Sequence, residues 1–174
     1  MKKTQFAILL FVLGGVATSI MVSAQEKKSP PATAEGKVGR ASISIAYSSP
    51  SVKGRKIGVE LAPYGKIWRA GANEATIFQT NKDITVEGKP LKAGKYSLFA
   101  ISGEKEWEFI FNSETGQWGI KRSGEANLDP AKNVLTVKVK PGKSASMNER
   151  LTYVINAKGV ALLWDNLEVP LAIK

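Results

Sequence analysis

The sequence predicts an all-β fold, an antiparallel β-sandwich. Apolar residues recur with a period of two in short runs, Gly and Pro turn signals lie about 8 to 12 residues apart, and no segment keeps a 3.6-residue apolar period. Many short strands without crossover helices favour antiparallel architectures. We expect a jelly-roll-like sandwich, with a flattened β-barrel as the alternative, because alternation alone does not separate the two.

Nine or ten short strands are expected along the chain. The first lies where Ile43, Ile45 and Tyr47 alternate with small residues, and the clearest is the run in which Trp107, Phe109 and Phe111 are predicted core. The remaining strands are expected at residues 57–61, 76–80, 84–86, 96–101, 134–139, 151–155, 160–164 and 167–173, and Leu91 follows the hairpin turn after 84–86. Residues 112–133 read as a loop that ends in one helical turn at 129–133.

The first 24 residues have the pattern of a secretory signal peptide. Lys2 and Lys3 precede an apolar run, and the small residues at 22–24 suit cleavage before Gln25. The alternative is a membrane anchor that stays in place, but an apolar stretch of about 16 residues is short for a ~30 Å hydrocarbon core. Residues 25–39 then read as a flexible leader and residues 40–174 as a single β-sandwich domain. We expect a periplasmic or secreted protein with no membrane span after signal cleavage.

Composition excludes several function classes. The chain has no Cys and no His, so disulfides, Ser-His-Asp and Cys-His nucleophiles and most zinc, copper and iron sites are ruled out. We expect no metal and no cofactor. Net charge is +10, or +8 once Lys2 and Lys3 leave with the signal, which favours an anionic partner. The lysines form no dense run, so nucleic acid is not expected, and the sequence does not indicate an oligomeric state.

One segment breaks the strand pattern and gathers the candidate site residues. Residues 63–78 read PYGKIWRAGANEATIF, and loops on a β scaffold commonly carry binding residues. The guanidinium of Arg69 suits a carboxylate or phosphate, and the aromatic rings suit stacking. Trp118, which lies between Gly116 and Gly119 in a loop, is the aromatic expected to be exposed or to line a cleft. The candidate ligand-binding residues are Tyr64, Lys66, Trp68, Arg69, Asn73, Glu74 and Trp118.

A structural role for the same residues is equally open at this stage. Arg69 could pair with Glu74 and pin the loop, and Asn73 could cap a turn through its own side chain. Glu74 is the best single candidate for an acid or base, but its partner carboxylate could be any of several glutamates. The partners considered are Glu60, Glu106, Glu108 and Glu149.

The chain resembles the domain of unknown function 2911 family, a group of exported bacterial proteins. The resemblance runs from about Arg40 to the C-terminus and rests on several motifs. These are SPSVKGR at 49–55, PYGKIWRAGANEAT at 63–76, AGKYSLF at 93–99, EW at 106–107, FN at 111–112, QWG at 117–119, DPA at 129–131 and ERLTY at 149–153. The family has no assigned activity, so the resemblance implies no catalytic residue.

Three functions stay open on the sequence. The first is a binding module that holds a small polar or anionic ligand or a glycan through the 64–74 loop. The second is a structural or interaction domain in which that loop locks the fold. The third is a hydrolase that works with carboxylates, since no His or Cys is present.

Overall fold

The computed structural model describes residues 29–174, which form eleven β-strands, one short 3₁₀ helix and no α-helix. The predicted signal peptide lies outside these residues, and none of the helical structure within them is long and apolar enough to cross a membrane. The elements are β1 (Pro31–Val38), β2 (Ala41–Ser48), β3 (Ile67–Trp68), β4 (Ala72–Thr80), β5 (Ile84–Val86), β6 (Lys89–Leu91), β7 (Gly94–Ile101), β8 (Trp107–Asn112), η1 (Pro130–Lys132), β9 (Asn133–Val139), β10 (Gly142–Asn156) and β11 (Gly159–Ala172).

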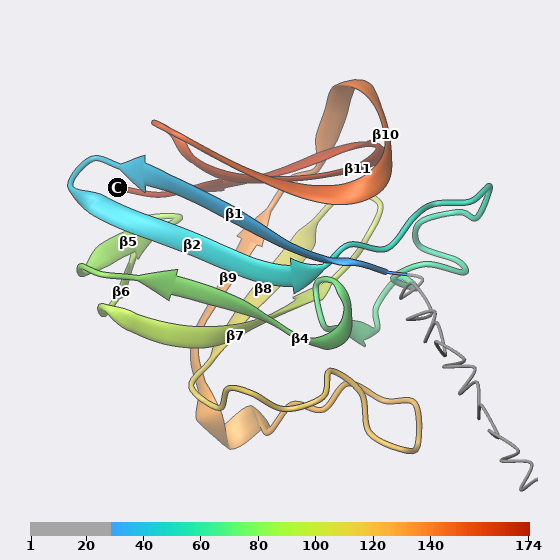
Figure 1. The fold of residues 1–174 in the computed structure, drawn as a ribbon, viewed down its shortest axis with the longest axis horizontal. Helices are drawn as coiled ribbons and strands as arrows, with labels where there is room; N and C mark the ends of the chain where they lie inside the picture. The colour runs from blue at the N-terminus through green and yellow to red at the C-terminus, as the bar shows by residue number, and fades with distance from the viewer. Residues whose placement is uncertain (1–28) are drawn as a thin grey trace, which may run out of the picture.

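One large antiparallel sheet forms the first layer of the fold (Figure 1). Its order is β1-β2-β4-β7-β8-β9, and the two-residue strand β3 pairs with β7 beyond the end of β4. Neighbouring strands follow chain order, so this sheet is a meander. Its connections therefore differ from the crossed connections that define a jelly roll.

The second layer is the long hairpin β10–β11, which curves over one face of the large sheet (Figure 1). The small hairpin β5–β6 extends this layer on one side through a bridge between Val86 and Ile173, and Ser51 extends it on the other through a bridge with Arg150. No sheet among the described residues closes into a barrel. The predicted all-β sandwich is therefore confirmed.

The main core fills the space between the two layers. Phe78, Phe109 and Phe111 of the sheet meet Leu151 and Trp164 of the hairpin, and all five are fully buried. The period-two alternation of β2 and β8 produced this face, as the sequence predicts. A second, smaller core lies on the opposite face of the sheet and is made of Ala75, Phe99, Ile110 and Leu128. Because Leu128 belongs to the segment after β8, that segment covers part of the outer face.

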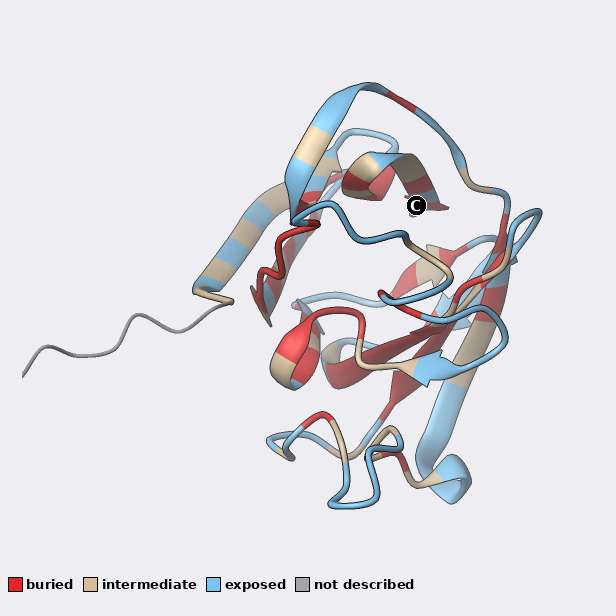
Figure 2. Ribbon diagram, turned by 90° about the vertical axis from the view of Figure 1, so that its right-hand side faces the viewer, coloured by how far each residue is buried: buried red, intermediate tan, exposed pale blue. Residues whose placement is uncertain are grey.

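The predicted flexible leader is wrong over Pro31–Val38, which is the edge strand β1. All eight of its residues pair with β2, and Figure 2 shows its alternating exposed and intermediate residues. The inward residues are small because the hairpin packs closely here: a Cβ on Gly36 would lie 2.7 Å from Cγ2 of Ile155. The sequence does not predict this strand because its inward residues, Ala32, Ala34 and Gly36, are too small to give a clear apolar alternation.

Two other strand predictions are also corrected. Residues 57–61 form turns with one bridge between Ile57 and Leu61, and the positive φ of Gly58 (89°) interrupts any extended run. The three strands expected after residue 150 are two longer ones, β10 and β11. Asp165, at φ 53°, sits at an irregularity within β11 that the sequence suggested as a break between strands.

Candidate functional site

The segment singled out by sequence spans the end of one strand, a tight reversal and the start of another. Ile67–Trp68 pairs with β7 as strand β3, and the chain then reverses to enter β4 at Ala72. Ala70 (φ 50°) and Asn73 (φ 58°) both have left-handed backbone conformations. Such values are uncommon outside glycine, so the surrounding contacts must hold this reversal in place.

Asn73 is one of those contacts. Its Nδ2 donates to the carbonyl oxygen of Ser29 and to Oγ of Ser48, at 3.1 Å each, and its own carbonyl accepts from the N–H of Gly119 at 3.0 Å. It thereby ties the start of β4 to the end of β2 and to the segment after β8. The role is structural, but it differs from the turn cap that the sequence left open for Asn73, because the partners of its side chain are distant in the chain.

Trp68 is also built into the fold. Its indole stacks on Trp164 with ring centroids 5.4 Å apart and an interplanar angle of 14°, and meets Trp107 edge-on at 6.3 Å. Its Nε1 donates to the carbonyl of Gly71 at 2.9 Å. The side chain is half-buried and packs against the main core. The indole N–H is therefore already hydrogen-bonded within the reversal, and only the apolar surface of the ring is left to contact another molecule.

Arg69 has a different environment. Its guanidinium makes no hydrogen bond and no ion pair with residues 29–174, although Nε is buried. Burial lowers the pKa of Arg69 from its ordinary value because the charged form has lost water. The aliphatic stem is fixed by Gly119, where a Cβ would lie 2.0 Å from Cδ of Arg69. The structure thus orients the arginine without neutralising it.

A groove of 1220 Å³ lies beside Arg69. The groove is lined by Ile67, Trp68 and Arg69, which we call its floor, and by Trp164, whose indole Nε1 is buried and has no partner among residues 29–174. Two buried donors without a partner therefore belong to residues of the same groove. Buried polar groups are seldom left unpaired, so each unpaired one calls for an explanation, and a bound ligand is one of them.

One wall of the groove is residues 53–66, which we call the flap and which projects from the body between β2 and β3 (Figure 1). Its conformation depends on positive φ values at Gly58 and Ala62. The ring of Tyr64 lies against Gly58, where a Cβ would be only 2.2 Å from Cζ. Tyr64 is 41% exposed, so this ring braces the flap while keeping an open edge.

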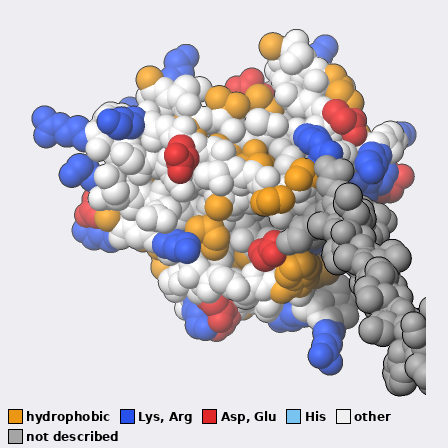
Figure 3. Space-filling model, viewed as in Figure 1, with side chains coloured by type: hydrophobic (Ala, Val, Ile, Leu, Met, Phe, Trp, Pro, Cys, Tyr) orange, Lys and Arg blue, Asp and Glu red, His pale blue; other side chains and the backbone are white. Residues whose placement is uncertain are grey.

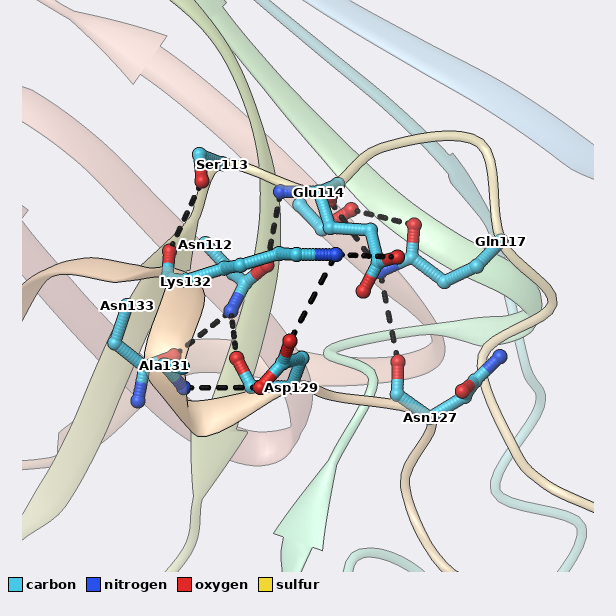
Figure 4. A network of polar contacts seen from close by, with 10 residues as sticks. Asn112, Ser113, Glu114, Gln117, Asn127, Asp129, Ala131, Lys132 and Asn133 are labelled. Atoms are coloured by element: carbon cyan, nitrogen blue, oxygen red, sulfur yellow. Dashed lines mark hydrogen bonds and ion pairs between the residues drawn. The ribbon is translucent and has the colours of Figure 1, made fainter.

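The opposite wall is part of residues 113–129, and a polar network anchors that segment at its base (Figure 4). Nδ2 of Asn112 donates to the carbonyl of Asp129 and to Oδ1 of Asn133, at 2.8 and 2.9 Å. Lys132 joins the two ends of the segment through Glu114 at 3.0 Å. The helical turn expected at 129–133 is present as η1, capped by Asp129. This wall is held by many bonds despite its lack of strands.

Five cations line the groove. Within residues 29–174, none of them has a carboxylate oxygen within 4.0 Å, which also holds for most cations outside the groove; the ion-paired ones are Lys92, Lys132 and Lys138. The cations that line the groove are Lys53, Arg55, Lys66, Arg69 and Lys121. Elsewhere, on the face shown in Figure 3, Lys and Arg side chains lie mainly around the edge. The only acidic residues in the lining are Glu60 and Glu125.

The structure brings together only part of the predicted site. Lys66, Trp68 and Arg69 line the groove, whereas Tyr64, Asn73, Glu74 and Trp118 do not. Trp118 is exposed as expected, at 51%, but it lies beside the start of β4, where it forms a backbone bridge with Glu74. Sequence reasoning missed Lys53, Arg55 and Lys121. They come from two segments that meet only in the fold, the turn at 53–55 and the loop after β8.

The glutamates considered for acid–base chemistry do not share the groove. Glu74 is exposed and outside it, Glu60 is the one of its considered partners that lines it, and three of those partners make other contacts. Glu60 accepts from the N–H of Lys56, Glu106 pairs with Lys138, and Glu149 accepts from the N–H of Lys53. Residues 29–174 contain no group of three or more acidic side chains that would hold a metal ion.

Comparison with known proteins gives one match. The family model described as "Protein of unknown function (DUF2911)" matches residues 29–173. No curated protein and no solved structure matches the chain. The match begins before β1, in agreement with the inclusion of that strand in the fold.

Proposed function

Since this chain belongs to the DUF2911 family of proteins of unknown function, its role has to come from the site itself, and we propose that it is an exported module that binds an anionic ligand in the groove. Arg69 is the principal anchor. Export is proposed from the signal-peptide pattern of residues 1–24. Ligand binding is proposed from the groove.

The observation that carries the proposal is the unpaired guanidinium of Arg69. Placing a cation in a partly buried position costs free energy unless an anion or hydrogen-bond acceptors compensate. Within residues 29–174 no carboxylate or carbonyl does so, yet the stem is clamped by Gly119. An anion-binding site would benefit from such a pre-oriented set of guanidinium donors. If Arg69 served only to stabilise the fold, its donors would instead form hydrogen bonds within the protein.

The rest of the lining suits the same ligand. Lys66 on the flap and Lys121 on the opposite wall raise the local positive potential, which favours an anion and speeds its association. Ile67 and Trp68 offer apolar surface on the floor, so the ligand can carry an apolar face beside its anionic group.

Isothermal titration calorimetry with carboxylate, phosphate and sulfate compounds tests the proposal. We expect saturable binding to the wild-type protein and loss of binding in Arg69→Met, which keeps the stem against Gly119 but removes the charge. Arg122→Met is the matched control, because Arg122 is exposed and does not line the groove. Equal binding by wild type and Arg69→Met, or no binding to any anion class, would count decisively against this function.

A folding lock remains supported for a different part of the same segment. The three polar contacts of Asn73 and the indole hydrogen bond of Trp68 hold the reversal between β3 and β4. We therefore propose a division of labour, in which Asn73 and Trp68 stabilise the loop that presents Arg69.

A further inference from the structure

The size of the groove is the first observation that bears on the class of ligand. Pockets for one small molecule commonly enclose about 300–1,000 Å³. The groove, at 1220 Å³, exceeds that range, and it lies open between the flap and the segment after β8. A single phosphate or carboxylate compound would leave much of it empty. The shape fits an extended ligand better than a compact one.

The placement of the cations is the second observation. They come from separate pieces of the chain: Lys53 and Arg55 follow β2, Lys66 precedes β3, Arg69 follows it, and Lys121 lies on the opposite wall. Nε and Nη2 of Arg55 donate to backbone carbonyls at 3.1 and 2.7 Å, which fixes that guanidinium on the wall. Cations distributed over both walls and the floor match a ligand that carries several anionic groups along its length.

The acceptors in the lining are the third observation. Glu60 already accepts from the N–H of Lys56 and Glu125 from Oγ of Ser123, but each carboxylate keeps further acceptor sites among the cations. A ligand that bore only anionic groups would be repelled by these two carboxylates, whereas sugar hydroxyl groups donate to them. Trp68 adds an aromatic surface on which the apolar face of a sugar ring can stack. The indole N–H of Trp68 already donates to the carbonyl of Gly71.

We infer that the groove binds a linear acidic oligosaccharide, with one sugar carboxylate on Arg69 and others reaching Lys66 and Lys121. This inference rests on the proposed function and adds the class of ligand. An anionic membrane surface fits less well, because a flat array of headgroups meets a convex or planar patch, whereas these cations line a concave groove. Membrane binding is therefore an outcome of the test.

The test measures affinity as a function of ligand length. The purified protein is titrated with galacturonic acid, with oligogalacturonates from dimer to hexamer, and with neutral maltooligosaccharides of the same lengths. We expect the hexagalacturonate to bind about tenfold more tightly than the dimer, because each added contact is made within an existing complex. We also expect a steeper loss of affinity with added salt for the hexamer, and no binding of the neutral series.

Variants separate the floor from the walls. Arg69→Met should abolish binding of every length. Lys66→Gln should weaken hexamer binding by about threefold and leave galacturonic acid unchanged, as expected for one exposed ion pair. Lys95→Gln is the matched control, because Lys95 is an exposed lysine on β7 outside the groove.

The outcomes distinguish this inference from the function on which it rests. If galacturonic acid binds through Arg69 with no gain from added sugar units, the oligosaccharide inference is overturned and the anion-binding function stands. If no anion binds, both fail. Binding to phosphatidylglycerol vesicles without binding to any oligogalacturonate would overturn it in favour of a lipid surface. Equal affinity for polyglutamate of the same charge would also overturn it, because only a charge field would then be recognised.

Discussion

Arg69 and Asn73 lie four residues apart in the same segment, yet the fold treats them in opposite ways. Nδ2 of Asn73 has two acceptors and its carbonyl has a donor, all from distant segments. The guanidinium of Arg69 has no partner among residues 29–174. A polar residue whose bonds are satisfied contributes to stability, and one held in place without them has donors available for another molecule.

The two residues are also connected through Gly119. Gly119 donates its N–H to the carbonyl of Asn73 and lies against the stem of Arg69. The contacts that fix Asn73 therefore also fix the direction of Arg69. The comparison predicts that changes near Asn73 lower stability, and that changes at the charged end of Arg69 leave it intact.

Asn73→Ala is expected to have the largest effect. It removes both Nδ2 hydrogen bonds and places an alanine at φ 58°, where its Cβ is strained. The two losses together should lower the free energy of unfolding by about 2–4 kcal/mol. Urea denaturation measures the change. Asn73→Gly, which tolerates positive φ, should lose about 1–2 kcal/mol. Equal losses in the two variants would show that backbone strain plays no part.

Gly119→Ala should have the next largest effect, because it disturbs both residues. The added Cβ would lie 2.8 Å from the carbonyl oxygen of Asn73 and 2.0 Å from Cδ of Arg69. We expect a loss of about 1–3 kcal/mol, as for overpacking in a core, together with weaker anion binding. In an Arg69→Ala background part of the clash is gone, so the loss should shrink. Strict additivity in this double-mutant cycle would contradict the clamping of Arg69 by Gly119.

These effects also show what the sequence carries and what it does not. The strands of the main core can be predicted because Ile43, Ile45 and Phe109 alternate with polar or outward-facing residues. This alternation does not depend on the details of side-chain packing. Strand β1 escaped prediction because close packing against Ile155 requires small residues, and Gly36 has no apolar signal. The sequence pattern therefore predicts strands that are buried through large apolar side chains. It misses strands that pack closely because their inward residues are small.

The site was predicted only as far as it is contiguous in the chain. The segment 63–78 contains Lys66, Trp68 and Arg69, and its departure from alternation marked it. The division of Arg69 from Asn73 depends on Ser29, Ser48 and Gly119, which no spacing rule connects to the segment. Which polar side chain is satisfied is a tertiary property, so residue type alone did not distinguish the anchor from the lock.

Tyr153 extends the comparison, because it stabilises the reversal next to Arg69. Its hydroxyl donates to the carbonyl of Ala70 at 2.8 Å, and burial raises its pKa well above the ordinary 10.0. The folded state therefore holds this proton more tightly than the unfolded state, so its stability is fully present below pH 10.0 and falls as pH rises further. Tyr153→Phe should cost about 1 kcal/mol at neutral pH and flatten the alkaline decline in unfolding free energy. An unchanged alkaline profile would assign that decline to other groups.

Arg69→Met should have the smallest effect on stability, and it decides how the segment is to be understood. The variant keeps an unbranched stem against Gly119, loses no hydrogen bond made with residues 29–174, and removes a partly buried charge. Its free energy of unfolding should stay within about 0.5 kcal/mol of the wild type, and Arg122→Met, at an exposed position, provides the baseline. A loss of about 2 kcal/mol or more would place Arg69 with Asn73 in the lock and remove the basis for a binding site.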